Sequence, residues 1–168
     1  MAPAYLSILL PQRPARAGIV CYPAGTPRLN AGSMTNTLKR IVAIADPFPD
    51  EAELYQLAFG NAGFALHSLP TDDARAAVDA VVASRAHLVV TRILPRQFGI
   101  ELVRALRANS RTAQVPVVVL TSYPDAKLHA AAHEAGANEL LLLPVDPDDL
   151  IKRARRLLLQ IDRASEAS

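Results

Sequence analysis

Short apolar runs alternate with longer amphipathic segments along the chain from Arg40 onward. The short runs predict five strands, at residues 41–45, 64–69, 88–91, 117–121 and 140–143. Because these runs are almost continuously apolar, the pattern indicates a parallel sheet that is covered by helices on both faces. Right-handed crossovers through the helices would join the strands. The predicted fold class is therefore α/β.

The amphipathic segments predict five helices, at residues 50–62, from Thr71, after Gly99, at 126–135 and from Asp146. In the first helix we expect Leu54, Leu57 and Ala58 to face the core, since they recur at helical spacing. Thr71 is the expected N-cap of the second helix. Asp146 is the expected N-cap of the last helix, with a proline at its first position.

Five prolines and two short apolar runs occupy residues 1–38. We expect a disordered extension, because the prolines break any helix and the runs are too short to span a membrane. No positive residue precedes the apolar run at 6–10, which argues against a secretory signal. Met34 is an alternative start of the chain. The predicted organisation is an extension at 1–38, one domain at 39–162 and a short tail at 163–168.

The composition fits one soluble domain, with 168 residues, 51% of them apolar and 20% charged. Residues 1–39 hold four basic residues and no acid, whereas the remainder holds 14 basic and 16 acidic residues. That near-neutral body gives no general argument for nucleic acid as a partner. Cys21 is the only cysteine, so no intramolecular disulfide can form, which agrees with a cytoplasmic location.

The segment at residues 87–99 joins an apolar strand to a loop with a proline and a glycine four residues apart. Pro95 and Gly99 follow Thr91 at the spacing that a proline and a glycine have after the phospho-acceptor aspartate of bacterial response-regulator receiver domains. The chain resembles that family from about residue 40 to 159. The resemblance implies a flavodoxin-like, doubly wound sheet of strand order 2-1-3-4-5, with its site at the carboxyl ends of strands one, three and four.

The resemblance places the family's site residues on five positions of this chain: Asp46, Pro47, Thr91, Thr121 and Leu143. Asp46 matches the first of two acids, and Pro47 replaces the second. Thr91 replaces the acceptor aspartate, and Thr121 matches the switch hydroxyl. Leu143 stands where the family has a lysine followed by a proline, so that lysine is missing here. A register with Pro47 as the family's proline breaks the spacing to Gly63, so the first register is preferred.

These replacements predict a degenerate phosphorylation site. A threonine hydroxyl is a weak nucleophile without a base to activate it, whereas a carboxylate can form an acyl phosphate. Asp46 alone offers one carboxylate to Mg²⁺, so weak or absent Mg²⁺ binding is expected, and no cofactor. Strand alternation directs Arg92 to the opposite face from Thr91, away from the expected pocket; only a bulge would turn it inward.

Two other groups of residues give weaker signals. His129 and His133 lie four residues apart on a predicted helix, but no third ligand has suitable spacing, so no metal site is assigned. The last helix carries a basic outer face, which is more typical of a solvated surface than of nucleic-acid binding. Glycine-rich phosphate loops and paired catalytic carboxylates are absent from the sequence, so we do not expect an enzyme.

The function predicted from these features is that of a stand-alone pseudo-receiver in a two-component or phosphorelay pathway. Its partner would be a histidine kinase, a phosphotransfer protein or an output protein. The family implies a partner surface, or a homodimer interface, on helix four, strand five and helix five, with the residues Lys127, His129, His133, Lys152 and Arg156. Two alternatives remain: a ligand- or redox-sensing module, and a receiver phosphorylated at a neighbouring acid such as Asp50.

Overall fold

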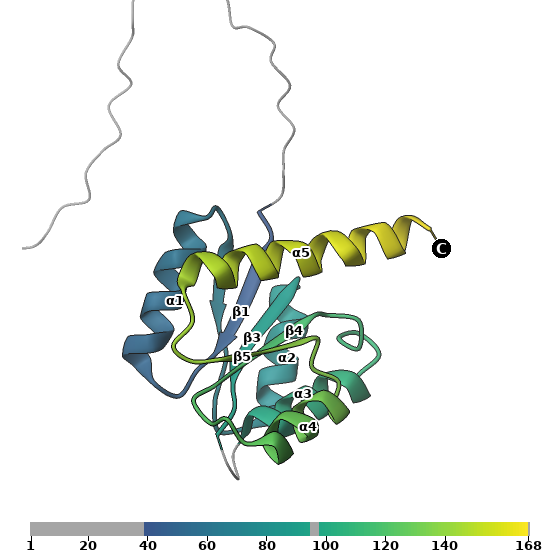
Figure 1. Ribbon diagram of the computed structural model, residues 1–168. Helices are drawn as coiled ribbons and strands as arrows, with labels where there is room; N and C mark the ends of the chain where they lie inside the picture. Colours follow the sequence, from purple (N-terminus) through teal and green to yellow (C-terminus); the bar gives the residue numbers. More distant parts are fainter. Residues whose placement is uncertain (1–38, 95–97, 168) are drawn as a thin grey trace, which may run out of the picture. The chain divides into compact units, whose positions relative to one another are not determined.

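The computed structural model describes residues 39–94 and 98–167, so the predicted extension at 1–38 and Pro95 lie outside the described residues (Figure 1). The strands are β1 (Ile41–Ala45), β2 (Ala65–Ser68), β3 (Leu88–Arg92), β4 (Val117–Thr121) and β5 (Glu139–Leu142). The helices are α1 (Pro49–Asn61), α2 (Ala74–Ser84), α3 (Phe98–Ala108), α4 (Ala126–Glu134) and α5 (Pro147–Glu166). The predicted elements are therefore confirmed, with ends that shift by a few residues.

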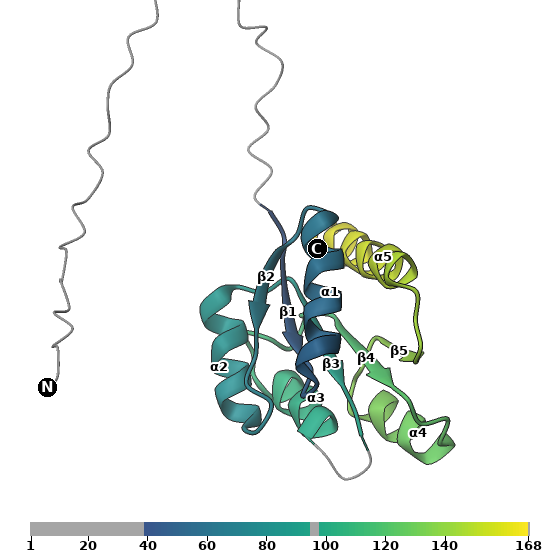
Figure 2. The same cartoon turned by 90° about the vertical axis from the view of Figure 1, so that its left-hand side faces the viewer.

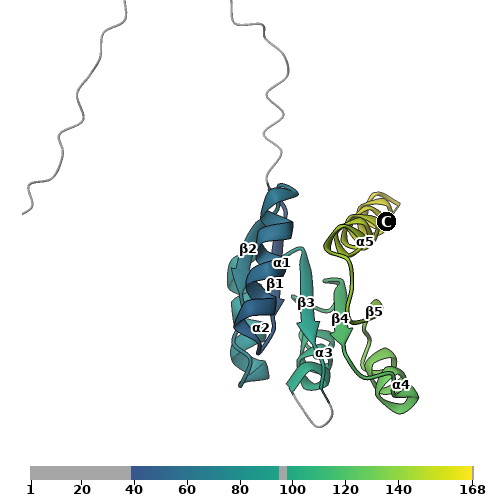
Figure 3. The same cartoon turned by 60° about the vertical axis from the view of Figure 1, so that its left-hand side comes forward.

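One parallel sheet of order β2-β1-β3-β4-β5 forms the centre of the fold. The arrows of β1, β3 and β4 point the same way in Figures 2 and 3, so their carboxyl ends meet at one edge. The predicted flavodoxin-like order is confirmed. In open α/β sheets a binding site typically lies at that edge, beside the strand where the order reverses.

Helices cover both faces of the sheet. One buried apolar cluster joins the central strands to α1 and α5, and a second joins them to α2, α3 and α4. Figure 1 shows α5 on the opposite side of the sheet from α3 and α4. Alternate residues of each strand therefore enter different clusters, and this alternation decides which side chains meet at the site.

The buried stripe of α1 differs from the predicted one. Leu54 and Leu57 are 51% and 62% exposed, whereas Tyr55 and Phe59 are buried against the sheet. Both stripes have helical spacing, but the aromatic one includes Ala58 and continues to the partly buried Ala62. The two aromatic rings remove more apolar area from water than two leucines would, which accounts for the rotation of the helix.

The helix ends agree in part with the predicted caps. Asp146 caps α5 as expected, since its carboxylate accepts the N–H of Asp148 at 2.8 Å. The cap of α2 is Asp73, not Thr71, and it accepts two backbone N–H groups of the first turn. α5 continues to Glu166, so the residues predicted as a tail are helical to that point. None of the described helices is both long and apolar enough to cross a membrane.

Gly99 holds α3 close to the end of β3. A Cβ atom at this position would lie 2.3 Å from the carbonyl oxygen of Arg92 and 2.4 Å from Cγ2 of Ile93. Because backbone cannot move aside as a flexible side chain can, only glycine fits here without a shift of the helix. The glycine therefore fixes the carboxyl edge of β3, where the site lies.

Candidate functional site

Three polar side chains meet at the carboxyl ends of adjacent strands. In the sheet register Ala45 pairs with Thr91, and Arg92 pairs with Leu120. The next residues along β1 and β4 that share the face of Arg92 are Asp46 and Ser122. All three therefore lie on the face that α1 and α5 cover, and no bulge is needed to bring them together.

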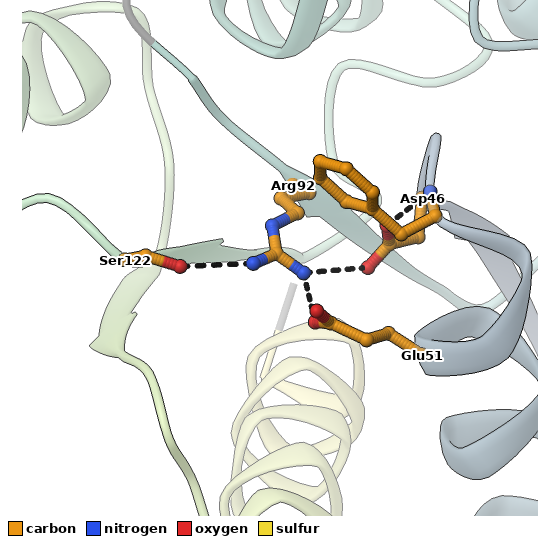
Figure 4. Close-up of polar contacts among 5 residues, drawn as sticks. Asp46, Glu51, Arg92 and Ser122 are labelled. Atoms are coloured by element: carbon orange, nitrogen blue, oxygen red, sulfur yellow. Dashed lines mark hydrogen bonds and ion pairs between the residues drawn. The ribbon is translucent and has the colours of Figure 1, made fainter.

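The guanidinium of Arg92 is the centre of this group (Figure 4). Nη1 forms an ion pair with Glu51, at the start of α1, and lies 3.6 Å from Oδ2 of Asp46. Nη2 donates a hydrogen bond of 2.9 Å to the hydroxyl of Ser122. The ring of Phe48 lies 4.6 Å from the guanidinium carbon, within the range of a cation–π contact. We refer to Asp46, Glu51, Arg92 and Ser122 as the Arg92 cluster.

The carboxylate of Asp46 is almost completely buried, with 2% of its side chain exposed. Oδ1 accepts the backbone N–H of Phe48 at 2.9 Å, and Oδ2 has no hydrogen-bond donor among the described residues. Burial raises the pKa of Asp46 above its usual value, although the N–H of Phe48 and the charge of Arg92 oppose the shift. Glu51 adds to the increase by repulsion. The N–H of Phe48 and the guanidinium of Arg92 thus both favour the charged form of this buried carboxylate.

Thr91 is fully buried and lies between Val89 and Ile93, both members of the cluster beneath α2 and α3. Its hydroxyl makes no hydrogen bond within the described residues. Strand alternation therefore sends Thr91 and Arg92 to opposite faces, as the sequence predicts. The expectation that this leaves Arg92 outside the site is wrong, because Asp46 lies on the face of Arg92.

The remaining predicted site residues do not contact the Arg92 cluster through any hydrogen bond or ion pair seen in the described residues. Thr121 is buried, and its hydroxyl accepts the backbone N–H of Tyr123 at 3.2 Å. Leu143 packs against the apolar cluster beneath α1 and α5, and Pro47 is exposed. Thr121 thus stabilises the turn after β4, and Leu143 contributes apolar contacts where the family motif has a cation.

Comparison with known protein families shows to which family this chain belongs. The response regulator receiver domain family matches residues 42–155. The chain belongs to this family. It is 31% identical over 124 residues to the DNA-binding response regulator MtrA of Mycolicibacterium smegmatis, a match that covers 73% of this chain and 52% of MtrA. It is 32% identical over 120 residues to the transcriptional regulatory protein GltR of Pseudomonas aeruginosa, covering 71% of this chain and 49% of GltR.

The receiver spans about half the length of these curated relatives. Solved structures agree on its fold. A response regulator from Chloroflexus aurantiacus superposes with a TM-score of 0.65 at 24% identity, covering 72% of this chain and 98% of that one. The receiver domain of the Pseudomonas aeruginosa sensor histidine kinase PA1611, which has a magnesium ion coordinated in its active-site cleft, gives 0.63 at 19% identity, covering 71% and 98%.

The residues of the Arg92 cluster do not fit a magnesium ion. Mg²⁺ requires about six oxygen ligands at about 2.0 to 2.1 Å, several of them water. The two carboxylates of the cluster instead contact the guanidinium of Arg92, and Pro47 offers no side-chain oxygen. Within residues 39–94 and 98–167, no three His, Cys, Asp or Glu side chains are close enough to hold a metal ion.

The predicted partner residues lie on α4 and α5, and several already have partners inside the receiver. Lys152 pairs with Asp149 at 3.1 Å, Arg156 pairs with Glu139, and Nε2 of His129 lies 2.9 Å from the carbonyl oxygen of Tyr123. Lys127 and His133 are exposed on α4. Two exposed apolar residues that the sequence did not single out, Tyr123 before α4 and Leu142 on β5, belong to the same elements.

Proposed function

We propose that this receiver is a pseudo-receiver, which acts in a two-component or phosphorelay pathway by binding a protein and without phosphorylation of its own site. The observation that supports this proposal is the state of Thr91, which replaces the acceptor in the preferred register. Its side chain is fully buried, and its hydroxyl has no base or other hydrogen-bond partner among the described residues. A hydroxyl in this state cannot be deprotonated for attack on a phosphoryl group.

Two other replacements support the proposal. Pro47 stands where the family motif has its second acid. Leu143 stands where the motif has its lysine, and it lies among apolar side chains. A phosphoryl group carries about two negative charges, so it needs cations or hydrogen-bond donors close by. The positive charge of the Arg92 cluster is the guanidinium of Arg92, and two carboxylates already contact it. The site therefore offers no activated nucleophile at the acceptor position and no positive charge that is free of a carboxylate.

The proposed partner is a signalling protein, such as a histidine kinase, a phosphotransfer protein or an output protein. We place its contact on α4, β5 and α5, where Lys127, His133, Tyr123 and Leu142 are exposed. Aromatic and aliphatic anchors with a rim of charges are typical of protein interfaces. DNA binding appears in the name of the relative MtrA, but we do not extend it to this chain, because the basic residues Arg153 and Arg156 pair with Glu139.

Incubation with acetyl phosphate and Mg²⁺, followed by intact mass spectrometry, tests the proposal. We expect no increase in mass by a phosphoryl group. The variants Asp46→Asn and Asp50→Asn locate any phosphate that does appear. An acid-labile phosphate that is lost in either variant would show a receiver that uses a neighbouring acid, and would contradict the proposal.

A further inference from the structure

Arg92, at the end of β3, joins two connections at the carboxyl edge of the sheet. It leaves β3, reaches Asp46 after β1 and Glu51 at the start of α1, and donates to Ser122 after β4. Figure 4 shows the guanidinium between the two carboxylates on one side and the serine hydroxyl on the other. A single side chain therefore links the β1–α1 and β4–α4 connections.

The position of the guanidinium is restricted from several directions. Only 6% of the Arg92 side chain is exposed, and its guanidinium carbon lies over the ring of Phe48. Nη1 faces carboxylates and Nη2 faces a hydroxyl, so rotation about the last side-chain bonds would break contacts at both ends. A planar group with donors in a fixed fork is suited to such bridging in a way that a lysine is not.

The charges of the cluster explain why a cation is needed there. Two carboxylates approach each other at the edge of a buried region, and their repulsion contributes to the raised pKa of Asp46. A cation between them offsets part of that repulsion. In the structural relative PA1611 a magnesium ion lies in the active-site cleft. In this receiver the chain itself supplies the positive charge, from the residue next to the position expected for the acceptor.

The contact to Ser122 gives this cation a second effect. Thr121, which matches the family's switch hydroxyl, is engaged by the N–H of Tyr123 in its own turn. The tie from β3 to the β4–α4 connection therefore passes through the neighbouring Ser122. That connection leads directly into α4, whose N-cap is Asp125. A fixed connection fixes the start of α4, and with it one side of the proposed partner surface.

We propose that Arg92 is a resident cation, which takes the place of a divalent metal ion and holds the β4–α4 connection in one arrangement without any ligand. This inference rests on the proposed function, because a tie that needs no ligand serves a receiver that signals without phosphate. The partner surface is then permanently formed, and association with the partner does not depend on Mg²⁺.

Hydrogen–deuterium exchange of the connection tests the tie. Ser122→Ala removes only the hydroxyl that accepts from Arg92, and Arg92→Met removes the charge but keeps an unbranched side chain. Both changes should speed exchange of the backbone amides of residues 122, 123 and 125 about tenfold or more, as expected for loss of a hydrogen bond to a charged group. Arg104→Met, at an exposed position of α3, is the matched control and should leave exchange at that connection unchanged.

Thermal unfolding with and without millimolar Mg²⁺ tests the replacement of the metal. The wild-type receiver and Arg104→Met should show no shift in melting temperature, whereas Arg92→Met should be stabilised, because its two carboxylates are free to bind the ion. If Mg²⁺ stabilised the wild type, or failed to stabilise a folded Arg92→Met variant, Arg92 would not be taking the place of a metal ion.

Unchanged exchange in Ser122→Ala would overturn the tie, and this variant decides the question even if Arg92→Met fails to fold. The proposed function has a separate readout. Uptake of phosphate by the wild type would contradict the proposed pseudo-receiver function, while the exchange result would remain valid. Unchanged hydrogen–deuterium exchange without phosphate uptake would contradict only the proposal that Arg92 is a resident cation.

Discussion

The pairing of Arg92 with Asp46 predicts a measurable coupling energy. Arg92→Met removes the guanidinium and retains most of the apolar stem, so the principal loss is the charge. Asp46→Asn removes the carboxylate charge and retains an oxygen that can accept the N–H of Phe48. The double variant removes both charges at once. These three proteins and the wild type form a double-mutant cycle.

The expected magnitudes follow from burial. Removal of one partner of a buried ion pair costs about 3 to 5 kcal/mol, because the other charge is left buried and unpaired. The side chains of Arg92 and Asp46 are only 6% and 2% exposed, but Glu51 is 42% exposed and stays hydrated. Loss of Arg92 would also remove a charge that lowers the pKa of Asp46, which favours the neutral form of the unpaired carboxyl. We therefore expect about 3 kcal/mol for Arg92→Met, the lower end of that range.

Asp46→Asn should cost less, about 1.5 kcal/mol, because Arg92 keeps its ion pair with Glu51. In the double variant no uncompensated carboxylate remains at residue 46, so the combined loss should be smaller than the sum of the single losses by at least about 1 kcal/mol. Urea unfolding followed by far-ultraviolet circular dichroism measures all four free energies. Additive losses, or a cost below about 1 kcal/mol for Arg92→Met, would refute the buried pair.

Three further changes test separate parts of the structure by the same unfolding measurement. Thr91→Val should leave the stability unchanged or raise it by up to about 1 kcal/mol, because it removes a buried hydroxyl without a partner, whereas Thr91→Asp should lower it. Gly99→Ala should be destabilising, since its Cβ would meet backbone at 2.3 Å. Gly60→Ala, inside α1, should be neutral or favourable, because the nearest atom to its Cβ would be a side-chain atom of Leu66 at 3.6 Å. His87 accepts the backbone N–H of Ile41, the first residue of β1. Burial lowers the pKa of His87 below 6.5, and the charge of Arg40 lowers it further. Stability should therefore fall as the pH drops from 7.5 through that lowered pKa, and His87→Gln should reduce this slope; a slope that is the same in both proteins would contradict the assignment.

The sequence was sufficient for the elements and the order of the sheet, because five continuously apolar runs have few other arrangements. It was insufficient for the orientation of α1. Leu54 and Leu57 form one helical stripe, and Tyr55 and Phe59 form another that is displaced by about one residue. Spacing alone does not rank the two stripes. The structure buries the stripe with the larger side chains.

The site shows a different limit. The family motif predicted that Asp46 and Thr91 share the site. Strand alternation then predicted that Arg92, next to Thr91, points away from it. Alternation along the strands contained the correct grouping, since Asp46, Arg92 and Ser122 share a face once the register is known. The register depends on packing across the whole sheet, so it was not available from β3 alone. Glu51 lacked any signal, because an acid in the first turn of a helix is common.

A crystal structure of the receiver grown with Mg²⁺ and beryllofluoride tests the pseudo-receiver most directly. Beryllofluoride mimics an acyl phosphate on an aspartate, and Mg²⁺ would be visible through its octahedral oxygen ligands. We expect the guanidinium of Arg92 between Asp46 and Glu51, a buried Thr91 without an adduct, and no metal at the carboxyl edge of the sheet. A beryllofluoride adduct on any acid of that edge, or a metal ion that has displaced the guanidinium, would contradict the proposed function.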